Sequence, residues 1–399
     1  MHTSVEGLVT SAAQTFADKV AIYDNGKPYS FIDIEILSDA IATALSKRGI
    51  EPGSVVSICA PNSVEWITCY YGILKAGCIV NPLNSMLSPP ELKYALSDCK
   101  SSLLFAPLSK LVSLRGEQPD TSATLVSLDE EYEGIESYAQ LTLELGRSQQ
   151  VSRNQPCSHE TLAQISTISY TSGTTGKPKG ALLSHRAILI NVTMTATMHG
   201  RKRDDIVVSA LPFSHVYGNV VMQTTFACGL TLVIHPTFQV ETILQSIQAH
   251  KATVFEGVPT MYLYLLNHPQ FDACDLSSIR FCTVGGQTMP LAKMKEVESR
   301  FDAPLLELWG MTELGGLGTT HALLGERRLG SIGVALPYVQ TRIVSISDYK
   351  KTMPVGEIGE LVVKGPITME GYLNRPDETL KSIDADGYLH TGDLGYVDA

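Results

Sequence analysis

Apolar positions along the chain alternate between helical and strand-like spacing. Helical periodicity covers residues 32–47, 64–75, 241–251 and 291–301, and a further helix is expected after Pro89-Pro90. Short apolar runs typical of strands lie at 54–59, 102–105, 206–211, 230–235, 253–256, 280–284 and 304–309. Asp24-Asn25-Gly26-Lys27 between apolar flanks predicts a hairpin turn. This alternation predicts a layered α/β architecture.

Two stretches depart from this pattern. Residues 118–164 are acidic and only weakly periodic, and we interpret them as a surface excursion. From Gly330 onward, short strands and turns predict a small β-rich part, as in GEIGELVV at 356–363. We therefore expect an α/β domain at 1–329, made of two subdomains with a boundary near 200, and a β-rich subdomain at 330–399.

Composition excludes several classes of protein. The 399 residues include 44% hydrophobic residues, enough for packed cores, and carry a net charge of −11 without the basic stripe of a nucleic-acid binder. The eight cysteines show no CxxC pairing, so disulfides and metal ligation are not expected. The N-terminus lacks a signal-peptide pattern, and the apolar stretch at 67–80 is interrupted by Lys75 and too short to span a membrane. A cytoplasmic location is the simplest expectation.

Residues 170–180 read YTSGTTGKPKG and carry the strongest chemical signal in the chain. Glycines let backbone N–H groups approach oxygen closely, hydroxyl groups donate hydrogen bonds, and lysines supply positive charge, which together predict a polyphosphate-binding loop. It is not a Walker A loop, because that pattern needs Ser or Thr after its lysine and Lys177 is followed by Pro178. Apolar strand-like residues on both sides argue against a solvated linker.

This loop resembles the phosphate loop of the acyl-adenylate-forming enzymes, which include acyl- and aryl-CoA ligases, luciferases and the adenylation domains of peptide synthetases. Further motifs of that family follow in the same order. They are LPFSHVYG at 211–218, GVPT at 257–260, GGQ at 285–287, WGMTE at 309–313, GSIG at 330–333 and HTGDL at 390–394. The likeness covers essentially the whole chain. It implies a layered αβαβα adenylation domain of two β-sheet subdomains, plus a small distorted β-barrel subdomain.

The resemblance implies that ATP and a carboxylic acid react to give an acyl-adenylate and pyrophosphate. The residues expected to grip the β- and γ-phosphates are Thr171, Ser172, Gly173, Thr174, Thr175, Gly176 and Lys179. Lys177 is a weaker candidate because Pro178 can direct it elsewhere. Thr312 would reach the α-phosphate, and Glu313 would hold Mg²⁺, which prefers oxygen ligands.

The same likeness implies a nucleoside site. Asp393 would accept hydrogen bonds from the ribose hydroxyls. Gly286 and Gln287 would lie along one face of the adenine and Trp309 along the other, with Gly310 and Met311 beside it. The family usually has Tyr at position 309 and Gly at position 308, so Trp309 loses a hydroxyl and Leu308 can narrow the adenine slot. Glu307 could accept a hydrogen bond from the adenine amino group.

The expected acyl pocket is apolar. Its predicted residues are the gate histidine His215, then Tyr217, Val221, Gly257, Val258, Gly285, Gly310, Leu314 and Gly315. Residues 206–240 contain no Asp, Glu, Lys or Arg, whereas amino-acid-activating relatives place an aspartate here for the substrate ammonium. We expect a fatty or aryl carboxylate, with chain length left open.

Three functions fit these residues. The leading one is the adenylating core of an AMP-forming acyl-CoA ligase, the second an acyl-AMP ligase that loads a carrier protein, and the third a catalytically idle module that binds ATP or acyl-adenylate. The resemblance implies a hinge and a mobile domain with a reactive lysine after residue 393, which residues 1–399 do not include. We favour a shortened longer protein over a natural end at this point, and expect these residues alone to adenylate slowly and to form no thioester with CoA.

Overall fold

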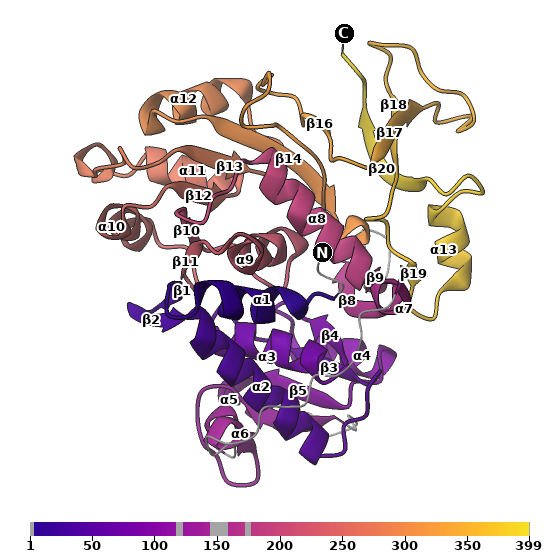
Figure 1. The fold of residues 1–399 in the computed structure, drawn as a ribbon. Coiled ribbons are helices and arrows are strands. Elements are labelled where there is room, and N and C mark those ends of the chain that lie inside the picture. Colours follow the sequence, from indigo (N-terminus) through magenta and orange to yellow (C-terminus); the bar gives the residue numbers. More distant parts are fainter. Residues whose placement is uncertain (1–3, 117–122, 144–158, 172–176, 399) are drawn as a thin grey trace.

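The computed structural model describes residues 4–116, 123–143, 159–171 and 177–398. Their strands form an eight-stranded sheet, a nine-stranded sheet and a three-stranded sheet. Figure 1 shows the two large sheets one above the other, with the three-stranded sheet to one side of them. The layered α/β architecture predicted from the sequence is confirmed. None of the described helices combines the length and the apolar composition of a membrane-spanning segment.

The eight-stranded sheet has the order β19-β9-β8-β4-β3-β5-β6-β7. Its strands are β3 (Val55–Ile58), β4 (Ile79–Pro82), β5 (Leu103–Ala106), β6 (Thr124–Ser127), β7 (Glu136–Ser137), β8 (Ile165–Thr171), β9 (Lys179–Ser184) and β19 (Gly371–Tyr372). The pairs from β8 to β7 are parallel, whereas β9 runs antiparallel to both β8 and β19. A segment from near the C-terminus therefore completes the edge formed by the hairpin β8–β9.

Two of the helices associated with this sheet begin at serine caps that the sequence supplies. Ser30 caps α2 by accepting from the Asp33 N–H, and Ser63 caps α3 in the same way. The helices of this part are α1 (Gly7–Phe16), α2 (Phe31–Lys47), α3 (Val64–Lys75), α4 (Pro89–Asp98), α5 (Leu108–Gly116), α6 (Tyr138–Leu143) and α7 (His159–Ala163). Helix α3 packs between α2 and the strands β3 and β4.

The nine-stranded sheet has the order β16-β15-β14-β13-β12-β10-β11-β1-β2. Its strands are β1 (Val20–Asp24), β2 (Lys27–Ser30), β10 (Ile206–Ser209), β11 (Thr231–Ile234), β12 (Val254–Gly257), β13 (Phe281–Val284), β14 (Leu305–Met311), β15 (Gly316–Thr320) and β16 (Val334–Ala335). The predicted hairpin is present as β1–β2, and Asn25 and Gly26 in its turn have φ of 47° and 78°. Strand β1 pairs with β11, so the N-terminal hairpin belongs to this second sheet.

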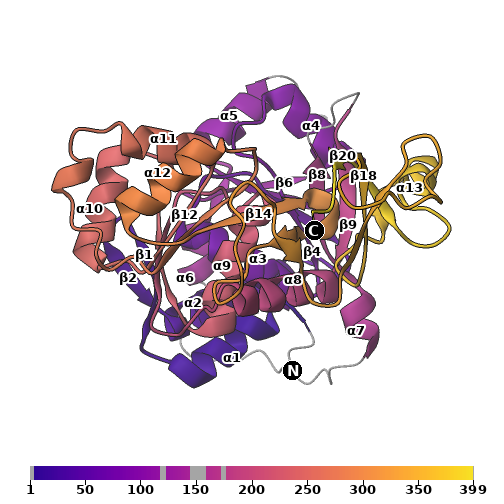
Figure 2. The same cartoon turned by 90° about the horizontal axis from the view of Figure 1, so that it is seen from above.

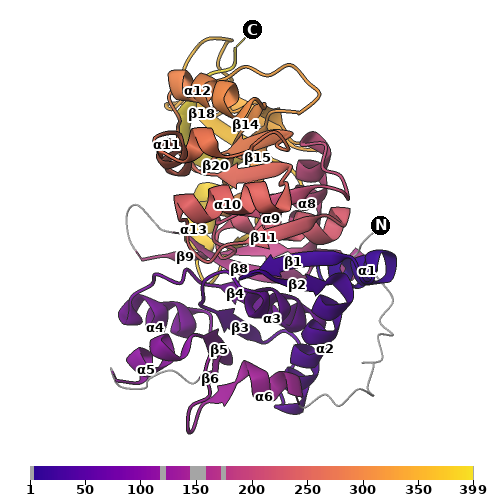
Figure 3. The ribbon, with the colours of Figure 1, turned by 90° about the vertical axis from the view of Figure 1, so that its left-hand side faces the viewer.

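Helices cover this sheet and connect its strands. They are α8 (His185–Met198), α9 (Val216–Cys228), α10 (Val240–His250), α11 (Pro259–Leu266) and α12 (Leu291–Phe301), with the 3₁₀ turns η1 (Phe271–Ala273) and η2 (Thr312–Leu314). Strands β10, β12, β13 and β14 are parallel, so their carboxyl ends meet at one edge. Figure 3 shows the two large sheets stacked, with α8 and α9 near their junction.

The C-terminal residues form an antiparallel sheet of β17 (Gln340–Val344), β18 (Gly359–Lys364) and β20 (Leu389–Gly395), together with α13 (Pro376–Ser382). Figure 2 shows this sheet and α13 at one side of the molecule, next to β9. One continuous apolar core nevertheless includes residues of all three sheets, among them Val80, Leu232 and Leu389.

The interpretation of residues 118–164 as a surface excursion is wrong for much of their described part. Strand β6 pairs with β5 inside the sheet, and its Val126 is fully buried. Tyr138 and Leu141 of α6 are buried as well, and α6 packs against α2. A four-residue strand is too short for its periodicity to stand out among the acidic residues around it.

Candidate active site

Thr171 and Lys179 face each other at the loop end of a β-hairpin. They are the last residue of β8 and the first of β9, and they are paired in the antiparallel register. The other predicted phosphate-binding residues, Ser172, Gly173, Thr174, Thr175 and Gly176, lie outside the described residues. The hairpin therefore fixes the two points at which the loop leaves and rejoins the sheet.

The ammonium group of Lys179 contacts the C-terminal part of the chain. Its Nζ lies 2.8 Å from Oε2 of Glu378 and 5.0 Å from the centre of the Tyr372 ring. The hydrogen bond from Lys179 lowers the pKa of Glu378, so this carboxylate is ionised at neutral pH. In Figure 1, β9, β19 and α13 lie together at one edge of the molecule.

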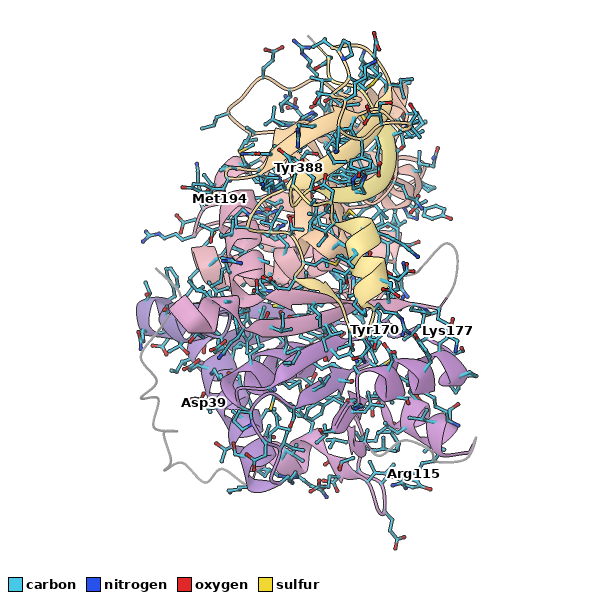
Figure 4. All side chains as sticks on the ribbon, turned by 90° about the vertical axis from the view of Figure 1, so that its right-hand side faces the viewer. Asp39, Arg115, Tyr170, Lys177, Met194 and Tyr388 are labelled. Carbon is cyan, nitrogen blue, oxygen red and sulfur yellow. The ribbon has the colours of Figure 1, made fainter. Side chains whose placement is uncertain are left out.

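Lys177 has a different environment. Its Nζ lies 5.3 Å from the centre of the Tyr94 ring, and the Tyr94 hydroxyl donates to the carbonyl of Pro178 at 3.2 Å. Figure 4 shows Lys177 and Tyr170 on the same edge of the molecule, beside α13. Lys177 and Lys179 thus contact different aromatic rings, from α4 and β19 respectively.

Thr312 and Glu313 lie in η2, directly after β14. Glu313 is buried, and its Oε1 accepts a 2.6 Å hydrogen bond from the Tyr372 hydroxyl. Burial and this hydrogen bond raise the pKa of Tyr372, so the hydroxyl keeps its proton. Because Tyr372 contacts both Lys179 and Glu313, the structure brings the predicted phosphate-binding lysine close to the predicted metal-binding carboxylate.

Trp309 and Asp393 form a hydrogen bond between two different sheets. The indole Nε1–H of Trp309, in β14, donates to Oδ2 of Asp393, in β20, at 2.8 Å. The indole ring packs against Gly318, where an added Cβ would lie 2.6 Å from its Cζ3. The residues predicted for the base and for the ribose are therefore direct neighbours, as the two halves of a nucleoside require.

The predicted adenine platform follows β13. Gly286 has φ of +85°, in the left-handed region that favours glycine. Leu308 packs against Gly285, where an added Cβ would lie 2.2 Å from Leu308 Cδ1. Gln287 is exposed. Leu308 thus fills the space that any side chain at position 285 would need.

Glu307 is buried next to this platform with an unused acceptor. Its Oε2 has no hydrogen-bond partner among the described residues, and burial raises the pKa of its carboxyl to about 7. Its main-chain N–H donates to Nδ1 of His321 at 3.4 Å. A buried polar atom without a partner calls for an explanation, and a ligand that donates a hydrogen bond would provide one.

His215 begins helix α9 as its N-cap. Its Nδ1 accepts a 3.3 Å hydrogen bond from the N–H of Tyr217. The residue is exposed to solvent, yet desolvation by the surrounding protein lowers its pKa, a combination expected for the wall of a concave surface. A neutral imidazole keeps Nδ1 available as the acceptor that caps the helix.

Several of the predicted acyl-pocket residues lie at the carboxyl ends of neighbouring strands. Gly257 of β12 is paired with Val284 of β13, and Val284 is paired with Glu307 of β14. Val258 lies close to Gly286, where an added Cβ would be 3.5 Å from its Cγ1. The other predicted pocket residues are Tyr217 and Val221 in α9, Gly310 in β14, and Leu314 and Gly315 at η2. Ligands of open α/β sheets bind at this edge.

Sequence reasoning missed a buried polar cluster behind Tyr217. The Tyr217 hydroxyl donates to Oε2 of Glu256 at 3.2 Å and also contacts the Thr283 hydroxyl. Glu256 forms an ion pair with Arg201, and both side chains are almost completely buried. Residues 206–240 carry no charge, but Tyr217 within this stretch contacts a charged residue from outside it. The glutamate inside the apolar strand at 253–256 could have indicated this buried charge.

Tyr372 and Glu378 were missed as well. Both are more than 190 residues away along the chain from Lys179, which they contact, and β19 has only two residues. Nothing in the local sequence indicates that this short strand pairs with β9.

The two stacked sheets and the contacts among the predicted site residues are consistent with an α/β enzyme. Residues 9–373 match the AMP-binding enzyme family, and the chain belongs to that family. It is similar to the long-chain-fatty-acid–CoA ligase of Bacillus subtilis, with 32% identity over all of this chain and 75% of the relative. The indoleacetate–CoA ligase of Aromatoleum aromaticum is also 32% identical, over 95% of this chain and 73% of the relative. The crystal structure of ATP-bound MatB from Rhodopseudomonas palustris has a TM-score of 0.90 at 28% identity, over all of this chain and 77% of MatB.

Proposed function

We propose that this chain is the adenylating core of an AMP-forming acyl-CoA ligase for a hydrophobic carboxylic acid. The observation that carries the proposal is a pair of contacts between predicted site residues. Lys179 and Glu313 both contact Tyr372, and Trp309 donates a hydrogen bond to Asp393. Membership of the family and the similarity to two CoA ligases support it.

In the proposed reaction a carboxylate oxygen of the acid attacks the α-phosphorus of ATP. The bond from the α-phosphorus to the bridging oxygen breaks, and pyrophosphate leaves with that electron pair. Both reactants are anions, so positioning and charge neutralisation are the main tasks of the protein. Thr171 and Lys179 bind the β- and γ-phosphates, and Thr312 reaches the α-phosphate. His215 is the gate residue between the channel for the carboxylate and the acyl pocket.

The residues around Glu313 fit a magnesium ion. Mg²⁺ prefers carboxylate and phosphate oxygens and retains several waters, so one or two protein oxygens are sufficient. Glu313 supplies a carboxylate and follows Thr312 directly in η2, and Tyr372, which donates to Glu313, also contacts Lys179. When bound, the ion would neutralise charge on the phosphates.

Adenosine would be held by the side chains at the ends of β14 and β20. Trp309 stacks on the base, opposite Gly286 and Gln287, and Asp393 accepts from the ribose. Glu307 accepts from the adenine amino group with the Oε2 atom that is otherwise unpartnered. The ATP bound to MatB supports a nucleotide in the corresponding fold.

The charge distribution around Tyr217 supports a substrate without an ammonium group. Glu256 is the carboxylate next to Tyr217, but Arg201, Tyr217 and Thr283 already occupy its oxygens. It is therefore not free to hold a substrate ammonium, whose burial without a partner would be costly. A fatty or aryl acid gains roughly 0.8 kcal/mol per buried methylene in such a pocket.

The second half-reaction would transfer the acyl group to the thiol of CoA and release AMP. The alternative acceptor is the thiol of a carrier protein, in which case the full protein would be an acyl-AMP ligase. The described residues do not distinguish between these two thiols. The similarity to CoA ligases favours CoA.

Thermal melting with non-hydrolysable acyl-adenylate mimics tests the proposal. The panel runs from acetyl through long-chain to benzoyl, with ATP alone alongside. A ligand at 100 times its dissociation constant adds about 2.7 kcal/mol to stability. A rise in Tm for one acyl class supports the adenylate site and identifies the substrate. No rise in Tm with any mimic or with ATP would contradict the proposal.

A further inference from the structure

One segment of the chain contacts both charged groups proposed to bind the triphosphate and its metal. This segment, residues 371–382, consists of β19 and α13. Tyr372 donates to Glu313, and Glu378 forms the ion pair with Lys179 at 2.8 Å. Lys179 is thus paired with a carboxylate of the protein itself.

The backbone of this segment is firmly attached to the hairpin. Tyr372 pairs with Ala181 across β19 and β9, and the N–H of Leu373 donates to the carbonyl of Gly180 at 2.8 Å. Arg375 contacts Asp98 and the hydroxyl of Tyr94 on α4. The position of α13 relative to Lys179 is therefore fixed from both sides.

The side chain of Glu378 nevertheless has an alternative partner. Its Oε2 accepts from Lys179, whereas its Oε1 lies 3.3 Å from Nζ of Lys381, one turn further along α13. Both Lys179 and Glu378 are partly exposed, with 28% and 36% of their side chains accessible. Glu378 can therefore release Lys179 and remain paired with Lys381, without leaving a charge uncompensated.

We propose that Glu378 is a positioning residue for Lys179. The Glu378 carboxylate holds the Lys179 ammonium group at the loop until the polyphosphate of the nucleotide displaces this carboxylate. This inference rests on the proposed function of Lys179. A triphosphate carries more negative charge than one carboxylate, so the exchange is favourable, but the ion pair must break first. Glu378 therefore weakens the binding of the polyphosphate part of the nucleotide. It does not affect the binding of the rest of the ligand.

The variant Glu378→Gln tests this directly, because it keeps the shape and removes the charge. Exposed ion pairs contribute little, so we expect ATP and inorganic pyrophosphate to bind about two- to fivefold more tightly by calorimetry at low salt. AMP has no β- or γ-phosphate, and its affinity should not change. Asp377→Asn is the matched control, since it removes the same charge from an exposed position in the same turn of α13. It should change ATP affinity less than Glu378→Gln.

A cycle with Lys179→Ala tests whether Glu378 acts through the lysine. In the Lys179→Ala protein, the gain in ATP affinity caused by Glu378→Gln should disappear. Unchanged or weaker ATP binding by the Glu378→Gln protein, an equal gain for AMP, or an equal gain in Asp377→Asn would each overturn the inference. If the unaltered protein binds neither ATP nor pyrophosphate, the proposed function fails, and this inference fails with it.

Discussion

The hydrogen bond between Trp309 and Asp393 ties the proposed base-stacking residue to the proposed ribose acceptor. Trp309→Phe keeps an aromatic ring on Gly318 but removes the donor that orients the Asp393 carboxylate. One hydrogen bond contributes about 1 kcal/mol, so we expect ATP affinity to fall roughly two- to tenfold. Calorimetric titration with ATP measures this loss.

Deoxynucleotides separate the two roles of Trp309. If its indole orients Asp393 toward the ribose, losing the 2′-hydroxyl should cost less affinity in Trp309→Phe than in the unaltered protein. The comparison of ATP with 2′-deoxy-ATP in both proteins gives this coupling. An equal cost in both would mean that Trp309 acts through its ring alone.

The buried carboxyl of Glu307 should make stability depend on pH. Burial raises its pKa from 4.5 to about 7, so the folded protein binds this proton more tightly than the unfolded chain does. The resulting contribution to the free energy of unfolding is fully present below about pH 4.5 and is lost as pH rises to about 7. The total loss is on the order of 3 kcal/mol. Urea unfolding between pH 5 and 8 should show Glu307→Gln gaining stability relative to the unaltered protein as pH rises. A constant difference across this range would contradict the assignment to Glu307.

At the scale of elements, the pair of Arg201 and Glu256 joins the residues after α8 to β12. Both charges are buried, and the Arg201 Nε and Nη1 atoms have no partner among the described residues. Removing one member leaves the other charge uncompensated, so Arg201→Met should cost about 3–5 kcal/mol in urea unfolding. The double variant Arg201→Met/Glu256→Met should be much closer to the unaltered protein. A loss below about 1 kcal/mol in the single variant would show that water or another group reaches Glu256.

The same elements show what the sequence could and could not predict. Strands such as β10 and β13 are apolar runs between turn residues, so local pattern was enough to find them. The strand-like residues on both sides of the glycine-rich loop were visible in the sequence, but their antiparallel pairing in the hairpin that carries Thr171 and Lys179 was not predicted. The contacts of Glu378 with Lys179 and of Tyr217 with Glu256 join helices to strands that are distant in the sequence, and local periodicity holds no information on such packing.

At the scale of the whole molecule, chain order and sheet order do not coincide. Strands β1 and β2 precede the first sheet in sequence but belong to the second, whereas β19, from the C-terminal part, belongs to the first. One apolar core contains residues of all three sheets. Separate unfolding of one large sheet would expose apolar surface on the other, which argues for coupled unfolding even in a chain of this size.

The two tryptophans allow this coupling to be measured. Trp66 is fully buried in α3, the helix that packs on β3 and β4 of the first sheet, and Trp309 lies in β14 of the second. Each single-tryptophan protein, Trp309→Phe or Trp66→Phe, reports one sheet by fluorescence, while far-ultraviolet circular dichroism reports both. We expect the fluorescence midpoint in urea to equal the dichroism midpoint within each variant, whatever stability the substitution itself costs. A fluorescence transition that precedes the dichroism transition in one variant only would show that the two sheets unfold separately, and that the shared core does not couple them.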